Sequence, residues 1–285
     1  MDGKRRPGER QPDHLQTGAN WYRSSLILTI MPDLIESAPL GVSLRSGVHS
    51  SVAGSGEPVV LIHGLSGSSR WWRKNVPVLA RQFRVYTIDL IGFGQSRRSG
   101  RFILEEASAR LVQWMDEVGL QRAHFVGHSM GGLVCADLAL KHPERVDRLV
   151  LVSATVIPFE WGFVGHGRRL ARALPRVPLA FLLVLAMDSI RAGPMTLIRA
   201  ARQLVAADIV QYLERIAAPT LAIWGERDPM VPVALGERVA AAIPGAELVV
   251  IKHAGHVLMW EQPAEFDQVL ATFLSGTLPM RGHAA

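Results

Sequence analysis

The sequence has few of the features that mark secreted, metal-binding or membrane-spanning proteins. Cys135 is the only cysteine among 285 residues, so no internal disulfide can form. The longest apolar run, PLAFLLVLAM (178–187), has about half of the ~20 residues that a membrane helix needs. The run LILTIM (26–31) is shorter than a signal-peptide core of ~7–15 residues. We therefore expect a cytoplasmic protein without stable membrane insertion, in which contact with a membrane surface stays open.

Motifs for metals, cofactors and nucleic acids are also missing. The histidines are dispersed, and no His-x-x-x-His arrangement with a third ligand is present, so no metal site is expected. Gly92-x-Gly94 does not open a helix directly after the first strand, as a dinucleotide-binding loop requires, and no cofactor is predicted. The net charge is +6, of which residues 1–23 carry +2 and residues 156–215 carry +4. Those arginines are scattered without interleaved aromatic residues, so nucleic-acid binding is not expected.

Short apolar runs alternate with helical patterns along the chain. Residues 1–23 show no apolar periodicity, which predicts a polar, disordered tail. The runs predicted as buried strands are 58–62, 84–90, 123–127, 148–153, 219–225 and 246–252. In 104–118 the apolar residues follow helical spacing, and Gly119 suits a C-terminal cap. Alternation of this kind predicts an α/β fold with a mostly parallel sheet and helices on both faces.

The alternation is interrupted once. Residues 156–215 contain no strand pattern and are rich in arginine. This segment is too long for a structureless loop in a compact domain, so it is predicted to be an inserted helical subdomain. The core then consists of residues 24–155 and 216–285.

The stretch Gly-His-Ser-Met-Gly (127–131) places Ser129 between a buried strand and a helix. So tight a turn forces its central residue into a strained conformation and requires small neighbours, a need that Gly127 and Gly131 meet. The helix that follows offers unpaired N–H groups suited to a developing negative charge. This context predicts that Ser129 is a nucleophile.

A nucleophilic serine needs a base, and the base needs an orienting acid. Asp228 follows the strand at 219–225, and His256 follows the strand at 246–252. The carboxyl ends of parallel strands meet at one edge of a sheet, where active sites of open α/β sheets lie. The sequence therefore predicts that Ser129, Asp228 and His256 converge.

With these residues in place, the chain resembles the α/β-hydrolase fold family from about residue 40 to residue 275. The matching stretches are LIHGLSGSS (61–69), DLIGFGQS (89–96), VGHSMGG (126–132), WGERDPMVP (224–232) and HAGHVLMWEQP (253–263). The resemblance implies Ser129 as nucleophile, His256 as general base and then acid, and Asp228 as the orienting acid. It also implies an oxyanion hole formed by the backbone N–H groups of Leu65 and Met130. The insertion at 156–215 would be the cap that roofs the active site.

Other residues compete less well for these roles. His253 lacks the preceding glycine that His256 has, and Asp89 is expected to tie down its loop rather than to orient the base. His63 and His128 are expected to be structural supports beside the active site. Cys135 is expected to be a small buried apolar residue.

The predicted reaction is hydrolysis of a carboxylic ester with an apolar acyl portion. A thioesterase, lactonase, carbon–carbon bond hydrolase or perhydrolase on the same triad stays open, as does a ligand receptor that turns over slowly. The run at 178–187 fits an acyl tunnel, a membrane contact or the buried face of a helix. Trp71, Trp72, Phe159, Trp161 and Phe163 are candidates for the wall of the pocket.

Overall fold

Seven strands of the described residues form one sheet. The structure is a computed structural model that describes residues 45–157, 168–169, 173 and 177–277. The strands are β1 (His49–Ala53), β2 (Glu57–Ile62), β3 (Phe83–Asp89), β4 (Ala123–His128), β5 (Val146–Val152), β6 (Thr220–Gly225) and β7 (Glu247–Ile251). All six predicted strands are present, and the predicted fold class is confirmed. The predicted tail at 1–23 lies outside the described residues.

The strand order is β1-β3-β2-β4-β5-β6-β7, and every neighbouring pair except β1–β3 is parallel. β1 is the strand that the sequence does not predict, because HSSVA lacks the continuous apolar run of a central strand. The chain order reverses between β2 and β4, which pair directly. In open α/β sheets the crevice for a ligand forms at such a switch, outside the carboxyl ends of the strands. The loops after β2 and β4 are therefore placed to build a site.

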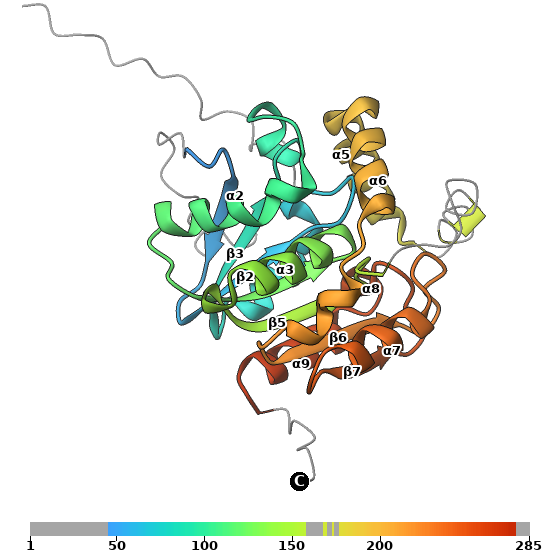
Figure 1. Ribbon diagram of the computed structural model, residues 1–285. Coiled ribbons are helices and arrows are strands. Elements are labelled where there is room, and N and C mark those ends of the chain that lie inside the picture. Colours follow the sequence, from blue (N-terminus) through green and yellow to red (C-terminus); the bar gives the residue numbers. More distant parts are fainter. Residues whose placement is uncertain (1–44, 158–167, 170–172, 174–176, 278–285) are drawn as a thin grey trace, which may run out of the picture. The chain divides into compact units, whose positions relative to one another are not determined.

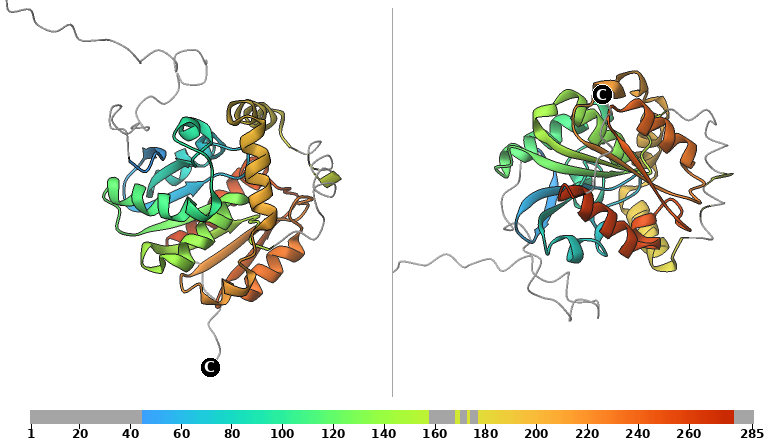
Figure 2. Two further views of the ribbon diagram at one scale, coloured as in Figure 1. Left: turned by 45° about the horizontal axis from the view of Figure 1, so that its top comes forward. Right: turned by 90° about the horizontal axis from the view of Figure 1, so that it is seen from below.

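Helices cover both faces of the sheet (Figures 1 and 2). Along β2, Val60 and Ile62 belong to one apolar cluster, whereas Val59 and Leu61 belong to the other. This alternation is what a strand buried on both sides requires. The first cluster includes residues of α2 (Leu104–Glu117), α3 (Met130–Lys141) and α7 (Val233–Ala242). The second includes residues of α1 (Val76–Leu79), α8 (Leu258–Glu261) and α9 (Pro263–Leu274).

Between β5 and β6, the described residues form helices and no strand. These are α5 (Leu179–Ala192), α6 (Pro194–Ala206) and the 3-10 helix η5 (Val210–Arg215). α5 contacts the 3-10 helices η1 (Ser69–Trp72) and η2 (Gly94–Arg98), while α6 contacts α2. Among the described residues no single helix has the length and hydropathy of a membrane span, and only the bent pair α5 and α6 reaches them together. The boundaries of the cap, 156 and 215, stay a prediction.

A carboxyl group lies buried between α1 and α9. Asp267 is 3% exposed and accepts a hydrogen bond from Asn75 Nδ2 at 2.7 Å. Burial raises the pKa of Asp267 from its ordinary 3.8 to about 6, although the Asn75 hydrogen bond opposes this shift. The folded state thus holds this proton more tightly than the unfolded chain does. Stability is therefore lost as the pH rises between about 4 and 6, where only the unfolded chain gains from ionisation.

Replacing Asp267 by Asn should stabilise the protein above pH 6, because the amide keeps an acceptor for Asn75 and cannot ionise. The gain in the free energy of unfolding should be about 3 kcal/mol at pH 8 and should shrink toward zero near pH 4. Urea unfolding across this pH range measures it. Glu265→Gln, on the exposed surface of the same helix, is the matched control. An equal effect of Asp267→Asn at all pH values would contradict the prediction.

Candidate active site

Ser129 occupies the turn between β4 and α3 with φ 53° and ψ −115°. Such a conformation costs a non-glycine residue about 1–3 kcal/mol, and the predicted strain is confirmed. A Cβ on Gly127 would lie 2.3 Å from the carbonyl oxygen of Gly131. A Cβ on Gly131 would lie 2.6 Å from the carbonyl oxygens of Ile62 and His63. The two glycines therefore allow the turn to close against the end of β2, as the sequence predicts.

His256 and Asp228 are joined directly. His256 Nδ1 lies 2.8 Å from Asp228 Oδ2, and the other carboxylate oxygen accepts hydrogen bonds from the backbone N–H groups of Met230 at 2.8 Å and Val231 at 2.9 Å. The Asp228 side chain has no exposed surface. An ionised carboxylate with all three donors in place favours the tautomer that carries a proton on Nδ1. The Nε2 of His256 is then left free to accept a proton.

The residue before Ser129 holds the histidine loop against the turn. His128 Nε2 donates to the carbonyl oxygen of His256 at 2.8 Å, and the centroids of the two rings are 4.8 Å apart. Burial and the neighbouring His256 hold the pKa of His128 well below 6.5, so its ring is neutral. The structure thus brings the Ser129 and His256 segments together. Within the described residues no hydrogen bond joins the Ser129 hydroxyl to His256; such bonds often tighten only when substrate binds.

The loop after β2 lies beside Ser129. A Cβ on Gly64 would be 3.1 Å from the Cβ of Ser129, so the loop backbone touches the nucleophile position. The N–H of Leu65 has no hydrogen-bond partner among the described residues. The N–H of Met130 lies in the first turn of α3, where backbone donors have no acceptor within the helix. Both predicted oxyanion donors are therefore positioned near one hydroxyl, and their role stays a prediction.

Comparison with known proteins identifies the family. Residues 57–191 and 187–263 match the family described as alpha/beta hydrolase fold. The chain belongs to this family. The predicted resemblance is confirmed, and the protein is a hydrolase of this fold.

Similar hydrolases carry different names. Carboxylesterase YbfK of Bacillus subtilis is 29% identical, with coverage of 92% of this chain and 96% of its own. The 2-hydroxy-6-oxononadienedioate/2-hydroxy-6-oxononatrienedioate hydrolase of Paraburkholderia phymatum is 32% identical, with coverage of 82% and 92%. The structure of Est816, described as an N-acyl homoserine lactone degrading enzyme, has a TM-score of 0.70 and 28% identity, covering 79% of this chain and 96% of that chain. Membership of the family thus identifies the protein as a hydrolase and does not identify its substrate.

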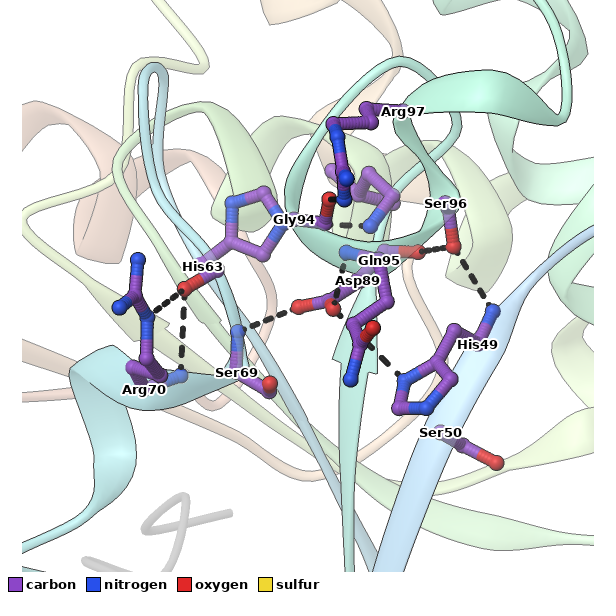
Figure 3. A network of polar contacts seen from close by, with 12 residues as sticks. His49, Ser50, His63, Ser69, Arg70, Asp89, Gly94, Gln95, Ser96 and Arg97 are labelled. Atoms are coloured by element: carbon purple, nitrogen blue, oxygen red, sulfur yellow. Dashed lines mark hydrogen bonds and ion pairs between the residues drawn. The ribbon is translucent and has the colours of Figure 1, made fainter. Parts of the chain in front are cut away.

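Asp89 holds two loops of this α/β hydrolase in place and does not contact His256. Its carboxylate accepts from the backbone N–H of Ser69 at 2.6 Å and of Gln95 at 2.7 Å, as Figure 3 shows. Gly94, at φ 48°, lies so close that a Cβ there would be 2.4 Å from the Asp89 carboxyl carbon. The prediction that Asp89 ties down its loop is confirmed, and His256 is paired with Asp228 instead.

His63 supports the loop that carries Leu65. Its Nε2 accepts a hydrogen bond from the backbone N–H of Leu90 at 3.1 Å, so its Nδ1 donates to the carbonyl oxygen of Gly64 at 2.8 Å. The side chain is buried, and burial lowers the pKa of His63 below 6.5. The predicted structural role of His63 is confirmed.

The aromatic candidates separate into two groups. Trp71 contacts the ring of His128 with centroids 5.5 Å apart, and that of Phe181 on α5 at 4.9 Å. Trp72 instead packs on Phe266 of α9, in the core. Only Trp71 of this pair therefore lies beside the candidate site. Phe159, Trp161 and Phe163 lie outside the described residues.

Asp188 ties the predicted cap to the loop after β2, and sequence reasoning missed it. Its carboxylate is 1% exposed, accepts from Ser68 Oγ at 2.8 Å and pairs with the Arg70 guanidinium. The neighbouring hydroxyls of Ser189 and Ser66 are 2.5 Å apart. Because Ser66 directly follows Leu65, α5 is fastened to the segment that presents the predicted oxyanion donor. The available signal was an aspartate directly after the apolar run at 178–187.

Glu261 is a second residue without a predicted role. One carboxylate oxygen accepts from the N–H of Gly255 at 2.5 Å and the other from the N–H of Val257 at 3.4 Å. The side chain thus clamps the backbone on both sides of His256. Burial raises the pKa of Glu261, while these two hydrogen bonds favour its ionised form.

Glu261→Gln should lower turnover by up to about a hundredfold, because the amide nitrogen would face a backbone N–H and loosen the His256 loop. The decrease should fall on kcat more than on KM, since substrate binding does not use Glu261. Steady-state kinetics with a p-nitrophenyl ester measures both parameters. Glu265→Gln, an exposed change nearby, should leave both unchanged, and equal kinetics of the two variants would contradict the clamp.

Cys135 lies inside α3 and is fully buried. Burial raises the pKa of its thiol far above the ordinary value, which keeps it protonated. Among the described residues no group of three or more His, Cys, Asp and Glu side chains could hold a metal ion. The thiol therefore packs as a small apolar side chain.

Native protein should not react with a disulfide reagent such as dithionitrobenzoate, because neither a thiolate nor an access path is available at Cys135. Unfolding in guanidinium should expose the thiol and release one equivalent of the coloured product per chain. Absorbance before and after unfolding measures this. Rapid labelling of the folded protein would show that Cys135 is not enclosed.

Proposed function

We propose that this α/β hydrolase cleaves a carboxylic ester with an apolar acyl portion through an acyl-enzyme on Ser129. The observation that carries the proposal is the His256–Asp228 hydrogen bond on a loop that His128 fastens beside the strained turn at Ser129. The tight turn presents the Ser129 hydroxyl at the end of β4, and the buried Asp228 carboxylate fixes the His256 ring that receives its proton.

In the first half of the reaction, Ser129 Oγ attacks the ester carbonyl carbon while His256 Nε2 accepts the hydroxyl proton. The imidazolium that forms is stabilised by Asp228, whose carboxylate accepts hydrogen bonds from His256 Nδ1 and from the backbone N–H groups of Met230 and Val231. When the tetrahedral intermediate collapses, the carbon–oxygen bond to the alcohol breaks. His256 then gives its proton to the leaving alkoxide, which departs as the alcohol.

The negative charge on the carbonyl oxygen needs donors of its own. The N–H groups of Leu65 and Met130 are assigned to this oxyanion, aided by the positive end of α3. Each such donor is worth about 10²–10³ in kcat. His63 contributes by keeping the Gly64 backbone in place through its Nδ1 hydrogen bond.

In the second half, His256 removes a proton from water, and the hydroxide attacks the acyl carbon. Collapse of this second intermediate releases the carboxylic acid, and Ser129 recovers its proton from His256. Ester and water are thus converted to alcohol and carboxylic acid, and Ser129 and His256 return to their starting protonation states.

An apolar acyl portion is supported by the side chains around the turn. Trp71 and Phe181, both buried, pack together beside His128, so the surroundings of the turn on this side are apolar. The carboxylesterase among the similar proteins supports an ester, whereas the similarity to Est816, described as an N-acyl homoserine lactone degrading enzyme, supports a lactone. Cleavage of a thioester or a carbon–carbon bond, peracid formation and slow turnover by a receptor are also compatible with this triad.

Ser129→Ala should abolish covalent labelling by a fluorophosphonate probe and reduce ester hydrolysis to background. Ser275→Ala, at the exposed end of α9, should label like the natural protein. Asp228→Asn should lower kcat by about 10⁴, because the histidine would lose the tautomer that accepts the proton. Gel fluorescence and initial rates measure these effects, and undiminished labelling of Ser129→Ala would overturn the proposal.

A panel of p-nitrophenyl esters of increasing chain length, with a thioester and a lactone, separates the linkages. The ester proposal expects the highest kcat/KM for an ester with a medium or long acyl chain. A clear preference for the lactone or thioester would replace the proposed linkage and keep the triad. A burst without steady-state turnover on all substrates would favour the receptor.

A further inference from the structure

Helix α5 has two sides of opposite exposure. Phe181, Val184 and Asp188 are buried. Leu183 is 59% exposed and Ile190 80% exposed, and their spacing puts them on one side of the helix. That side of a surface helix is normally polar. The run PLAFLLVLAM is therefore only half buried, and its other half faces solvent.

The exposed apolar surface continues onto α6. The two helices are bent by 99° relative to each other across Gly193, and they stand at the top of Figure 1 and in the left view of Figure 2. Six of the nine large apolar side chains that are exposed within the described residues lie on this pair. We call them the cap apolar face: Leu179, Leu183, Met187, Ile190, Met195 and Ile198.

The charges on these two helices have one sign at the surface. Arg191, Arg199 and Arg202 are exposed. The one acidic residue of the described helices α5 and α6 is Asp188, which is buried and paired with Arg70. The outer surface of the pair therefore combines aliphatic side chains with cations and presents no carboxylate.

We propose that the cap apolar face docks on an anionic lipid surface. Aliphatic side chains enter the boundary between headgroups and acyl chains, while guanidinium groups bind lipid phosphates. Charge complementarity selects this occupant, because the exposed charges of the pair are all positive.

Two other occupants fit the same face less well. Protein interfaces concentrate their binding energy in Trp, Tyr and Arg, and the cap apolar face contains no aromatic residue. A second copy of the chain would bring arginines of like charge together, which is unfavourable.

The opposite side of α5 reaches the candidate active site. Through Asp188 and Ser189 it holds Ser66 and Ser68, which follow Leu65 in the loop beside Ser129. Docking would therefore place the site close to a surface in which apolar esters accumulate. The docking itself depends on the exposed face and the arginines, and it holds whichever bond the enzyme cleaves.

Vesicle flotation of the full chain tests the proposal. The protein should float with vesicles of phosphatidylcholine and phosphatidylglycerol and bind pure phosphatidylcholine far less. The double variant Leu183→Ser with Ile190→Ser should weaken binding at least about tenfold, since two inserted side chains are lost. Arg191→Gln with Arg199→Gln should weaken it by about tenfold at low salt, with a smaller difference at high salt.

Matched controls separate the face from general effects. Val78→Ser removes an exposed apolar side chain on α1, away from this helix pair, and should float like the natural chain. Ser129→Ala should also float normally, so that loss of hydrolysis and loss of docking are read independently. Thermal melting shows that each variant is folded.

Four results would overturn the proposal. The first is that the natural chain does not float with anionic vesicles, and the second is that the Leu183→Ser, Ile190→Ser variant floats as well as the natural chain. The third is that deletion of residues 1–23 abolishes flotation while the Leu183→Ser, Ile190→Ser variant still floats. This result would assign binding to the basic tail. The fourth is that light scattering finds a dimer of the natural chain, that the Leu183→Ser, Ile190→Ser variant is monomeric, and that neither binds vesicles. This result would assign the face to a second copy of the chain.

Discussion

Close backbone approach at the ends of β2 and β4 is the constraint on which the candidate site depends. Gly131 sits under the carbonyl oxygens of Ile62 and His63, and Gly64 sits against the Cβ of Ser129. Any side chain at these positions would push the two loops apart. The switch in strand order makes β2 and β4 neighbours, and the glycines let their loops touch. Ser129, the proposed nucleophile, and Leu65, a proposed oxyanion donor, therefore come from segments far apart in sequence but adjacent at one edge of the sheet.

Three buried carboxylates hold the surrounding loops in position at that edge of the sheet. Asp228 orients His256, Asp89 gathers the loops around Ser69 and Gln95, and Asp188 fastens α5 to the loop after β2. Each accepts hydrogen bonds from at least one donor outside its own segment, so that none of these buried charges is left unpaired. The loops are thus positioned by polar contacts whose removal would leave an unpaired group in the interior. Rigidity of this kind is what a preorganised site needs.

Much of this arrangement follows from the sequence. The central strands are continuous apolar runs, the turn at Ser129 has glycines at fixed offsets, and Asp228 and His256 each follow a strand. β1 escaped prediction because an edge strand pairs on one side only and needs no apolar run. Asp188 and Glu261 escaped because their partners lie on other loops or in the backbone, and no spacing rule reports such contacts. The half-exposed state of α5 likewise depends on tertiary contacts, which hydropathy alone does not report.

The tie between α5 and the loop after β2 limits how modular this enzyme can be. Caps of α/β hydrolases are inserted between core strands, which suggests that one could be exchanged for another. Here the cap side of the tie, Asp188 and Ser189, is matched by Ser66, Ser68 and Arg70 on the core side. A transplanted cap that lacked Asp188 and Ser189 would leave Arg70, Ser66 and Ser68 without these partners beside Ser129. Helix α5 and the loop after β2 are therefore structurally coupled, and a chimera has to move both.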